Sequence, residues 1–280
     1  MVATLRLVLP ILLSMAAVVA IDRAAARRGR QLPGLEIGGA AGWAARRVIA
    51  LGALGLALYL GVFAPLGTVG TDHGINLSQV SVVQLFVLHA VFAVALVLYL
   101  GSGLWRPSDS RRPVSWREEL GVSSASPARE VGLGLASGVL GWGGVIVLLS
   151  LLAALVVALG GEQVLPSSPP PTIVFVAALP WGLRLLLSLS AGLVEEAFFR
   201  GLLQPRIGII ASSILFVLAH VSYDQPFLLI GVTVLSFGLA ALTRWRRTIW
   251  PAVVAHAVFD AIQLLVIIPI ALRVLESGGG

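Results

Sequence analysis

The sequence has no cysteine, no lysine and few charged residues of any kind. The absence of cysteine excludes disulfide bonds, a thiol nucleophile and thiolate ligands for a metal ion. Only 11% of the 280 residues are charged, and 58% are hydrophobic. A water-soluble globular chain has about 25% charged residues, so a soluble fold is excluded. Any chemistry must rest on Glu, Asp, His, Ser or Thr.

The hydrophobic residues form long blocks that contain almost no charge. An α-helix needs about 20 apolar residues to cross the hydrocarbon core of a bilayer. The sequence therefore predicts an all-α fold, a polytopic transmembrane helical bundle with about eight spans. We place these spans at residues 7–21, 48–66, 80–100, 131–159, 173–204, 207–221, 227–242 and 249–272.

Arginine lies in every second connection between the predicted spans. The alternate connections contain Asp72, His73, Glu162 and Asp224 and no arginine. Since cytoplasmic loops carry the excess of basic residues, the pattern places the arginine-rich side in the cytoplasm and both termini outside. All 19 basic residues are arginine, and this composition is typical of a GC-rich bacterial genome. We therefore expect an integral protein of the bacterial cytoplasmic membrane.

The net charge of +6 does not indicate a nucleic-acid partner. The arginines lie in connections between apolar spans, whereas nucleic-acid sites place them on elements that fit a groove.

The first apolar segment could also be a signal peptide, because Val18, Val19 and Ala20 resemble a cleavage site. The basic residues follow this segment, however, and a signal peptide has them before it. In the fourth span, Gly134 and Gly138 form a GxxxG motif, which predicts close helix contact.

Ionisable residues inside the predicted spans are the candidates for function. Each costs about 2.5–3.5 kcal/mol at bilayer depth on insertion scales, so it must be paired, hydrated or functional. We expect His89 to be a buried, hydrogen-bonded residue rather than a catalyst. We expect Arg184 to snorkel or to meet a carboxylate. The remaining candidates are Glu195, Glu196, Arg200, His220, His256 and Asp260.

Helical spacing divides these candidates into pairs. Adjacent Glu195 and Glu196 project about 100° apart on a helix, so they cannot share one role. Glu196 and Arg200 have the i, i+4 spacing of an ion pair, which leaves Glu195 without a local cation and suited to act as a general base. His256 and Asp260 have the same spacing and point in one direction.

Three motifs in this order resemble those of the CPBP family of intramembrane proteases. Glu-Glu-x-x-x-Arg begins at Glu195, Phe-x-x-x-His at Phe216 and His-x-x-x-Asp at His256. The family includes CAAX prenyl endopeptidases and bacterial bacteriocin-processing or immunity proteins, and the likeness covers residues 173–272. It implies a glutamic-type intramembrane endopeptidase, a hydrolase without a cofactor that cleaves a membrane-associated peptide or protein. A bacterial origin argues against a prenylated substrate.

The resemblance also implies roles for single residues. Glu195 and His220 would activate a water molecule, and His256 and Asp260 would face the oxyanion of the attacked carbonyl. A base-activated water and donors to a developing negative charge are the two largest contributions to amide hydrolysis without a covalent intermediate. The supporting residues would be Glu196, Arg200 and Phe216.

Asp260 departs from the family pattern, in which Asn is usual. An ionised Asp cannot donate to an oxyanion. Asp260 is therefore protonated by burial, or it orients His256, or the two His and two carboxylates bind a metal such as zinc or manganese. We favour the orienting role.

The buried Glu, His and Asp residues also allow a different class of function. A proton-coupled transporter or a non-catalytic membrane scaffold would use the same residues, although the sequence has no inverted repeat of the transporter kind. Within the protease interpretation, the polar stretch at 105–130 separates two parts. We expect accessory transmembrane helices at 1–130 and a catalytic core at 131–280.

Overall fold

The computed structural model contains helices and no strands in the part of the chain that it describes. The described residues are 2–27, 39–67, 82–101, 115–165, 171–221 and 225–278. Six helices in these ranges are long and apolar enough to cross a membrane, and a shorter apolar helix covers Leu85–Leu100. The predicted all-α class and a count of about eight spans are therefore confirmed. The predicted connections at Asp72, His73 and Asp224 lie outside the described residues.

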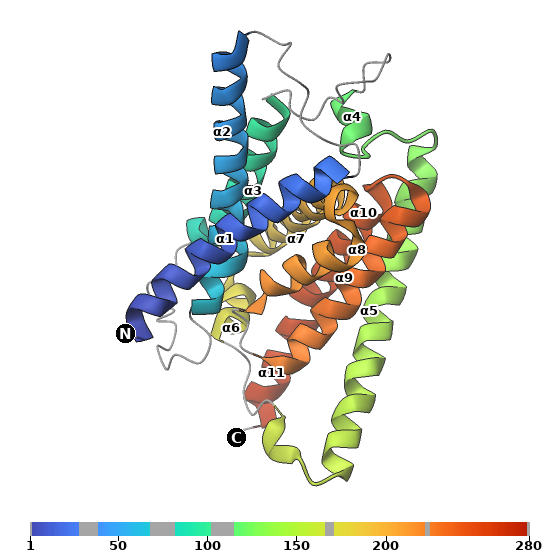
Figure 1. Cartoon of the computed structure of the whole chain (residues 1–280). Coiled ribbons are helices and arrows are strands. Elements are labelled where there is room, and N and C mark those ends of the chain that lie inside the picture. Colours follow the sequence, from blue (N-terminus) through green and yellow to red (C-terminus); the bar gives the residue numbers. More distant parts are fainter. Residues whose placement is uncertain are drawn as a thin grey trace.

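The N-terminal helices form one side of the molecule. α1 (Val2–Arg27) runs obliquely across the bundle, and α2 (Gly39–Leu58) continues into the π-helix η1 (Tyr59–Phe63) and the 3-10 helix η2 (Ala64–Gly67). α3 (Val82–Gly101) packs beside α2, as Figure 1 shows. Together these helices pack against the helices that are formed by the middle of the sequence.

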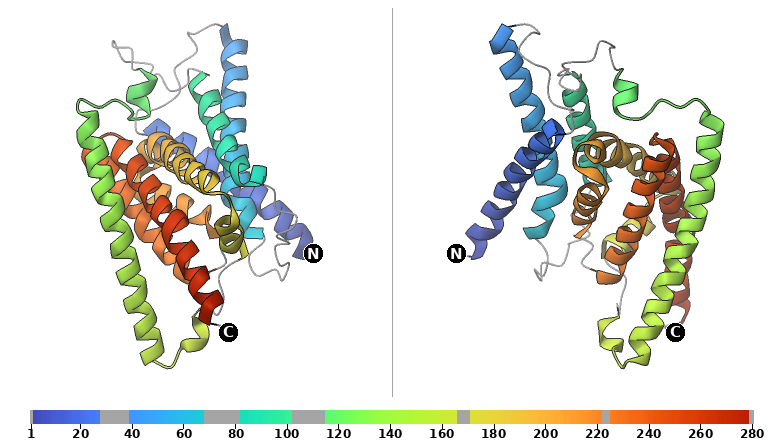
Figure 2. Two further views of the ribbon diagram at one scale, coloured as in Figure 1. Left: turned by 180° about the vertical axis from the view of Figure 1, so that it is seen from behind. Right: turned by 45° about the vertical axis from the view of Figure 1, so that its right-hand side comes forward.

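The central helices begin with a short polar turn. α4 (Trp116–Glu119) starts at a capping box, in which the Ser115 hydroxyl accepts from the Glu118 backbone N–H. α5 (Pro127–Ala158) is the longest helix and lies along the outer edge of the bundle (Figure 2). Most of its large apolar side chains point away from the protein, as a lipid-facing helix requires. It ends before the 3-10 helix η4 (Glu162–Val164).

The predicted span at 173–204 is divided in the structure. α6 (Pro171–Ala178) ends before Pro180, and α7 (Trp181–Glu196) begins directly after it. Proline has no N–H to continue a helix and disfavours helical backbone in the residue before it, which explains the break. α7 continues into the π-helix η5 (Ala197–Leu203) and α8 (Gln204–Leu218).

The helical backbone turns sharply at Gly208, near the predicted boundary between spans five and six. Gly208 has a φ of 88°, a value that other residues adopt only with strain. The following helices are α9 (Pro226–Arg246), α10 (Trp250–Ala261), the π-helix η7 (Ile262–Ile267) and α11 (Ile268–Gly278).

Glycines allow α10 to approach its two main neighbours closely. A Cβ on Gly134 of α5 would lie 2.5 Å from Val254 Cβ, and one on Gly138 would lie 2.8 Å from the Ala255 carbonyl oxygen. A Cβ on Gly192 of α7 would lie 2.7 Å from the Val253 carbonyl oxygen. The close contact that the GxxxG motif predicts is therefore confirmed, and it fixes α10 between α5 and α7.

One hydrophobic core joins the N-terminal helices to the rest of the bundle. Phe92 of α3 is stacked on Phe198 of η5, with ring centroids 4.4 Å apart, and Phe199 meets both rings edge to face. Residues of α1 and α2, such as Ile21 and Ala57, belong to the same buried cluster. Dispersion and burial therefore hold α3 firmly against η5.

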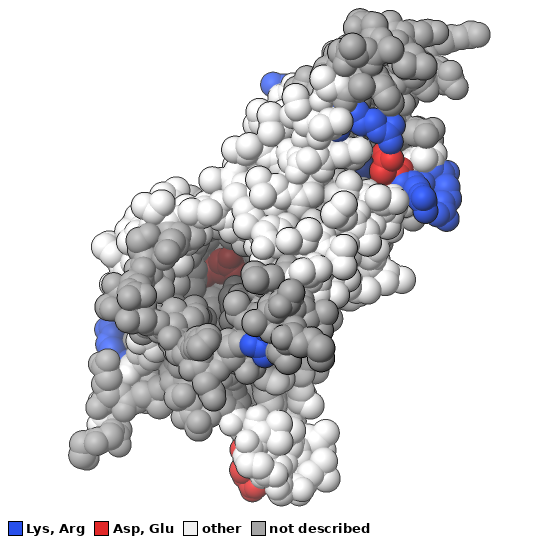
Figure 3. Space-filling view, turned by 60° about the vertical axis from the view of Figure 1, so that its left-hand side comes forward, with Lys and Arg blue, Asp and Glu red and all other residues white. Residues whose placement is uncertain are grey.

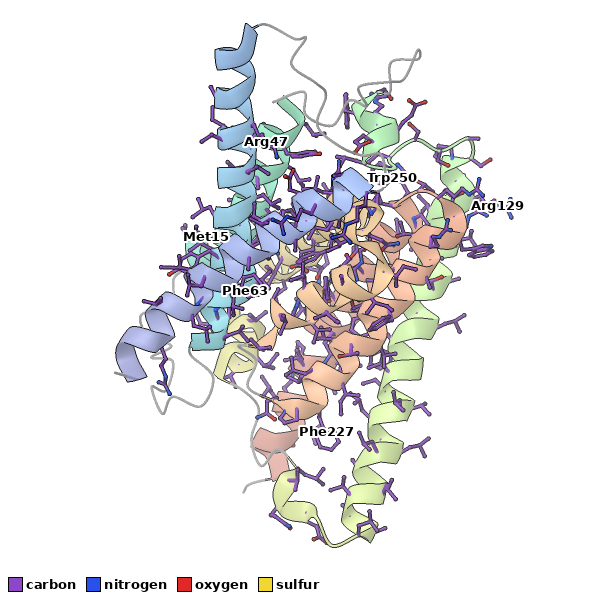
Figure 4. All side chains as sticks on the ribbon, in the orientation of Figure 1. Met15, Arg47, Phe63, Arg129, Phe227 and Trp250 are labelled. Carbon is purple, nitrogen blue, oxygen red and sulfur yellow. The ribbon has the colours of Figure 1, made fainter. Side chains whose placement is uncertain are left out.

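Buried ion pairs gather at one end of the bundle, which we call the arginine-rich end and which contains α4 and the start of α5. Glu130 accepts two hydrogen bonds from Arg246, at 2.7 and 3.1 Å, and Glu119 pairs with Arg206. Arg129 lies at this end in Figure 4, and in Figure 3 the charged side chains gather mainly at one side of a largely uncharged face. The surface beside these charges is thus largely uncharged.

Candidate active site

Glu195, Glu196 and Arg200 come from the junction between α7 and η5. Glu195 is 7% exposed, Glu196 is fully buried and Arg200 is 1% exposed. Arg200 Nη1 lies 3.0 Å from Glu196 Oε1, so the ion pair expected from the i, i+4 spacing is confirmed. The two carboxylates have different partners, as their angular separation predicts.

The π-helical backbone of η5 is stabilised by a side chain of the next helix. The Ser212 hydroxyl donates to the Phe199 carbonyl oxygen at 2.7 Å. π-helical turns release backbone carbonyls from the regular pattern and are frequent at functional sites. In this chain one follows the Glu pair and another, η7, begins two residues after Asp260.

Glu196 and Arg200 are members of one buried network. Glu196 Oε1 also accepts from His256 Nδ1 at 2.9 Å. Arg200 donates to the Ser236 carbonyl oxygen and hydroxyl on α9, at 3.1 and 3.2 Å. The network therefore connects α7, η5, α9 and α10, and it orients His256 through Glu196.

His220 lies just after α8 and faces the other carboxylate. Its Nδ1 is 2.8 Å from the Phe216 carbonyl oxygen, which can only accept, so Nδ1 carries the hydrogen. In the neutral ring, Nε2 is then an acceptor. Nε2 lies 3.8 Å from Glu195 Oε2, which is too long for a direct hydrogen bond.

His256 and Asp260 point in one direction from α10, as their spacing predicts. His256 Nε2 lies 3.6 Å from Asp260 Oδ2, beyond hydrogen-bond distance. The Asp260 side chain is 26% exposed, whereas that of His256 is 4% exposed. His256 is thus oriented by the hydrogen bond that its Nδ1 donates to Glu196, and not by a direct hydrogen bond to Asp260.

Phe216 packs among these groups. Its ring is stacked on His220 at a centroid distance of 4.6 Å and meets His256 edge to face at 5.7 Å. The Arg200 guanidinium lies 4.2 Å from the ring centroid. The expectation of a ring beside the His220 imidazole is confirmed, and the ring separates the guanidinium from that imidazole.

Two residues outside the motifs have contacts that the sequence does not specify. His89 is buried and hydrogen-bonded, as expected, but its Nε2 lies 3.3 Å from Glu195 Oε1 on another helix. Arg184, which was expected to snorkel or to meet a carboxylate, donates to the Leu264 carbonyl oxygen at 3.0 Å. The only sequence signal for the His89 contact is a polar residue within an apolar span.

A cavity of about 950 Å³ reaches this network from the arginine-rich end. Its lining includes Arg200, Gln204, Arg244 and Arg247. Within the described ranges, no three His, Asp or Glu side chains form a group that could share one metal ion. The arrangement instead offers Glu195 Oε2, which is buried without a hydrogen-bond partner among the described residues, as is Glu196 Oε2.

These features define an integral membrane protein with a buried Glu and His site. Residues 175–262 match the family model described as type II CAAX prenyl endopeptidase Rce1-like. The match confirms, over this segment, the resemblance to a protease family. It contains every motif residue, namely Glu195, Glu196, Arg200, Phe216, His220, His256 and Asp260.

A curated relative is similar to part of the chain. The uncharacterized protein YpbD of Bacillus subtilis (strain 168) is 35% identical over 79 residues, which are 28% of this chain and 42% of that protein. The chain thus matches less than half the length of this relative. No solved structure matches the chain.

Proposed function

We propose that this protein is a glutamic-type intramembrane endopeptidase that hydrolyses a peptide bond in a membrane-associated substrate. The observation that carries the proposal is the pair of acceptors formed by Glu195 Oε2 and His220 Nε2, 3.8 Å apart. A water molecule has two hydrogens and can donate to both. The site thus fits a water that is polarised from two sides and attacks with its oxygen.

Glu195 is the general base in this mechanism. It accepts a proton from the water as the oxygen attacks the peptide carbonyl, and the same proton is available for the leaving amine. Such proton transfer contributes about 10²- to 10⁴-fold to a rate. The Glu195 side chain is buried and its Oε2 has no other hydrogen-bond partner among the described groups, so that oxygen remains available for the reaction.

His256 is the group that stabilises the oxyanion. Glu196 accepts from Nδ1, so Nε2 points toward the site beside Asp260. Nε2 can donate only when the ring is an imidazolium, and the carboxylates on its two sides supply the compensating negative charge. A donor that is fixed before the reaction costs no reorganisation when the charge develops.

The substrate reaches the site from the cytoplasm. The cavity at the arginine-rich end leads to Arg200, which pairs with Glu196 in the site. Its lining includes arginines and polar side chains, which suit a hydrated polypeptide segment. The positive-inside rule assigns this end to the cytoplasm. Substrates that expose a polar segment next to a membrane anchor fit this arrangement, and the mechanism requires no metal ion.

Replacing Glu195 by Gln in the native host tests the proposal. The substitution preserves shape and removes the base, so it should stop cleavage without unfolding the protein. Protein termini are then compared by mass spectrometry between cells with the wild-type chain and cells with Glu195→Gln. We expect at least one membrane-associated peptide bond to remain intact in the variant.

Glu162→Gln is the matched control, because Glu162 is an exposed carboxylate outside the site. Its cells should show wild-type termini. Identical termini in wild-type and Glu195→Gln cells would contradict proteolysis. A proton flux into reconstituted vesicles that Glu195→Gln abolishes would then favour transport instead.

A further inference from the structure

His89 connects the N-terminal helices to the candidate base. It lies on α3, outside the segment that matches the protease family, and it is 8% exposed. Its two ring nitrogens contact two side chains of α7. Nδ1 lies 2.9 Å from Ser190 Oγ, and Nε2 lies 3.3 Å from Glu195 Oε1.

We propose that His89 is a positioning residue that holds Glu195 Oε1 and thereby directs Oε2 toward His220. The inference rests on the proposed function. A carboxylate with one oxygen fixed by a donor can rotate less about its terminal bond. Fixing Oε1 therefore keeps Oε2 at the place where it meets the water shared with His220, and holding reacting groups in one geometry raises the rate.

The contact with Glu195 assigns the tautomer of His89. A carboxylate oxygen accepts, so Nε2 carries the hydrogen that is donated to Glu195, and in the neutral ring Nδ1 is then an acceptor. The Ser190 hydroxyl beside Nδ1 has one hydrogen, and it also lies 3.0 Å from the Leu187 carbonyl oxygen, to which it donates. Ser190 thus holds the ring by contact at Nδ1, with Nε2 facing the carboxylate.

The packing of α3 fixes the height of His89 beside Glu195. Phe92, three residues further along α3, is fully buried and stacked on Phe198 of η5. On the opposite side, a Cβ on Gly61 of η1 would lie 2.5 Å from Phe92 Cζ and 2.8 Å from Leu88 Cδ1. α3 is therefore enclosed between η1 and η5. In this proposal the N-terminal helices supply one wall of the site.

Kinetics of the reconstituted full chain test this role. The substrate is a synthetic peptide that spans the bond left intact in Glu195→Gln cells. His89→Leu removes the donor and keeps the bulk, and we expect kcat to fall about 10- to 100-fold with an unchanged KM, as loss of an outer-shell partner does at other sites. His89→Gln restores a donor near the position of Nε2 and should recover kcat to within a few-fold of wild type.

Ser190→Ala sharpens the test, because it should lower kcat in the wild-type background and have no effect in the His89→Leu background. Ser14→Ala is the matched control. Ser14 is a buried serine of α1 that donates to the Gly55 carbonyl oxygen, away from Glu195. Its variant should retain wild-type kcat.

Two results would overturn the inference and leave the proposed function standing. One is a kcat of His89→Leu within twofold of wild type while Glu195→Gln is inactive. The other is an equal loss for His89→Leu and His89→Gln that follows a lower melting temperature, which would make His89 merely structural. If Glu195→Gln cells lose no peptide product, the proposed function fails and the inference fails with it.

Discussion

The carboxylates at the arginine-rich end and those in the site are both buried, but they have different partners. Glu130 uses both oxygens to accept from Arg246, and Glu119 pairs with Arg206, which also donates to Tyr99. In the site, Glu195 has two imidazoles within 4 Å and one oxygen without a hydrogen bond from any described group.

This difference in partners distinguishes carboxylates that stabilise the fold from a carboxylate that is available to react. A carboxylate that is fully paired with a guanidinium has no capacity left for a substrate or water, and its pairing is bidentate and rigid. A buried carboxylate with an unsatisfied oxygen costs stability, and a protein tolerates that cost mainly where the group has a function. Glu195 belongs to the second kind. Glu196, although adjacent in sequence, is intermediate: its Oε1 pairs with Arg200 and accepts from His256, while its Oε2 has no hydrogen-bond partner among the described residues.

The largest expected effect is on the rate of cleavage. His220→Ala removes one of the two acceptors for the water, so kcat should fall about 10²- to 10⁴-fold. The melting temperature should change little, because His220 is only partly buried and its hydrogen bond to Phe216 is local. Purified protein in vesicles provides both measurements. A variant that keeps more than about one tenth of the wild-type kcat would remove His220 from the mechanism.

At the arginine-rich end, the corresponding change should affect stability instead. Arg206→Met leaves Glu119 buried without its guanidinium, which costs about 3–5 kcal/mol. Unfolding in mixed detergent micelles measures this loss, and kcat per folded molecule should stay at the wild-type value.

The matched control for that prediction is the double variant Glu119→Gln with Arg206→Met. It also removes the buried charge of Glu119 and should recover part of the stability. If Arg206→Met is as stable as wild type, the carboxylates at the arginine-rich end do not differ from those in the site by stabilising the fold.

A smaller loss of stability is expected from a substitution at the contact between α5 and α10. Gly134→Leu forces a side chain against Val254 and should cost about 1–3 kcal/mol through overpacking. Gly132 provides the control on the same helix, because a Cβ there meets nothing within 4 Å. The midpoint of the unfolding transition of Gly132→Leu should equal that of wild type. Equal losses for both variants would contradict the assignment of the effect to the α5 and α10 contact, because leucine has the higher helix propensity at both positions.

The smallest effect is expected at Asp260. Its oxygen lies 3.6 Å from His256 Nε2, and Glu196 already orients that ring at 2.9 Å. Asp260→Asn should therefore change kcat by less than about tenfold. Glu196→Gln should lower kcat more, because it changes the group that accepts from Nδ1. A loss for Asp260→Asn as large as that for His220→Ala would restore the orienting role to Asp260.

Local spacing predicts the parts of the site that lie within one helix. The Glu196 and Arg200 pair follows from i, i+4 geometry, and so does the common direction of His256 and Asp260. The length of the apolar blocks likewise predicts the membrane spans, because a helix in lipid makes all its backbone hydrogen bonds within itself. These features depend on a few consecutive residues and need no knowledge of the packing.

Contacts between helices lie beyond such patterns. The sequence indicates that His89 is costly at bilayer depth, but it does not identify Glu195, 106 positions away, as its partner. The sequence does not predict the hydrogen bond from His256 to Glu196 either, because that bond depends on how α10 packs against Gly192 of α7. The break at Pro180 is visible as a proline, yet the block around it remains apolar apart from Arg184.

The claim that one water molecule is shared between two side chains has a direct kinetic test. The kcat of Glu195→Gln, of His220→Ala and of the double variant is measured on the same peptide in reconstituted vesicles. If both side chains act on one water, the second substitution has nothing left to remove, and the double variant should match the slower single variant within a few-fold. Losses that multiply in the double variant would show that Glu195 and His220 act independently, and the account would be wrong.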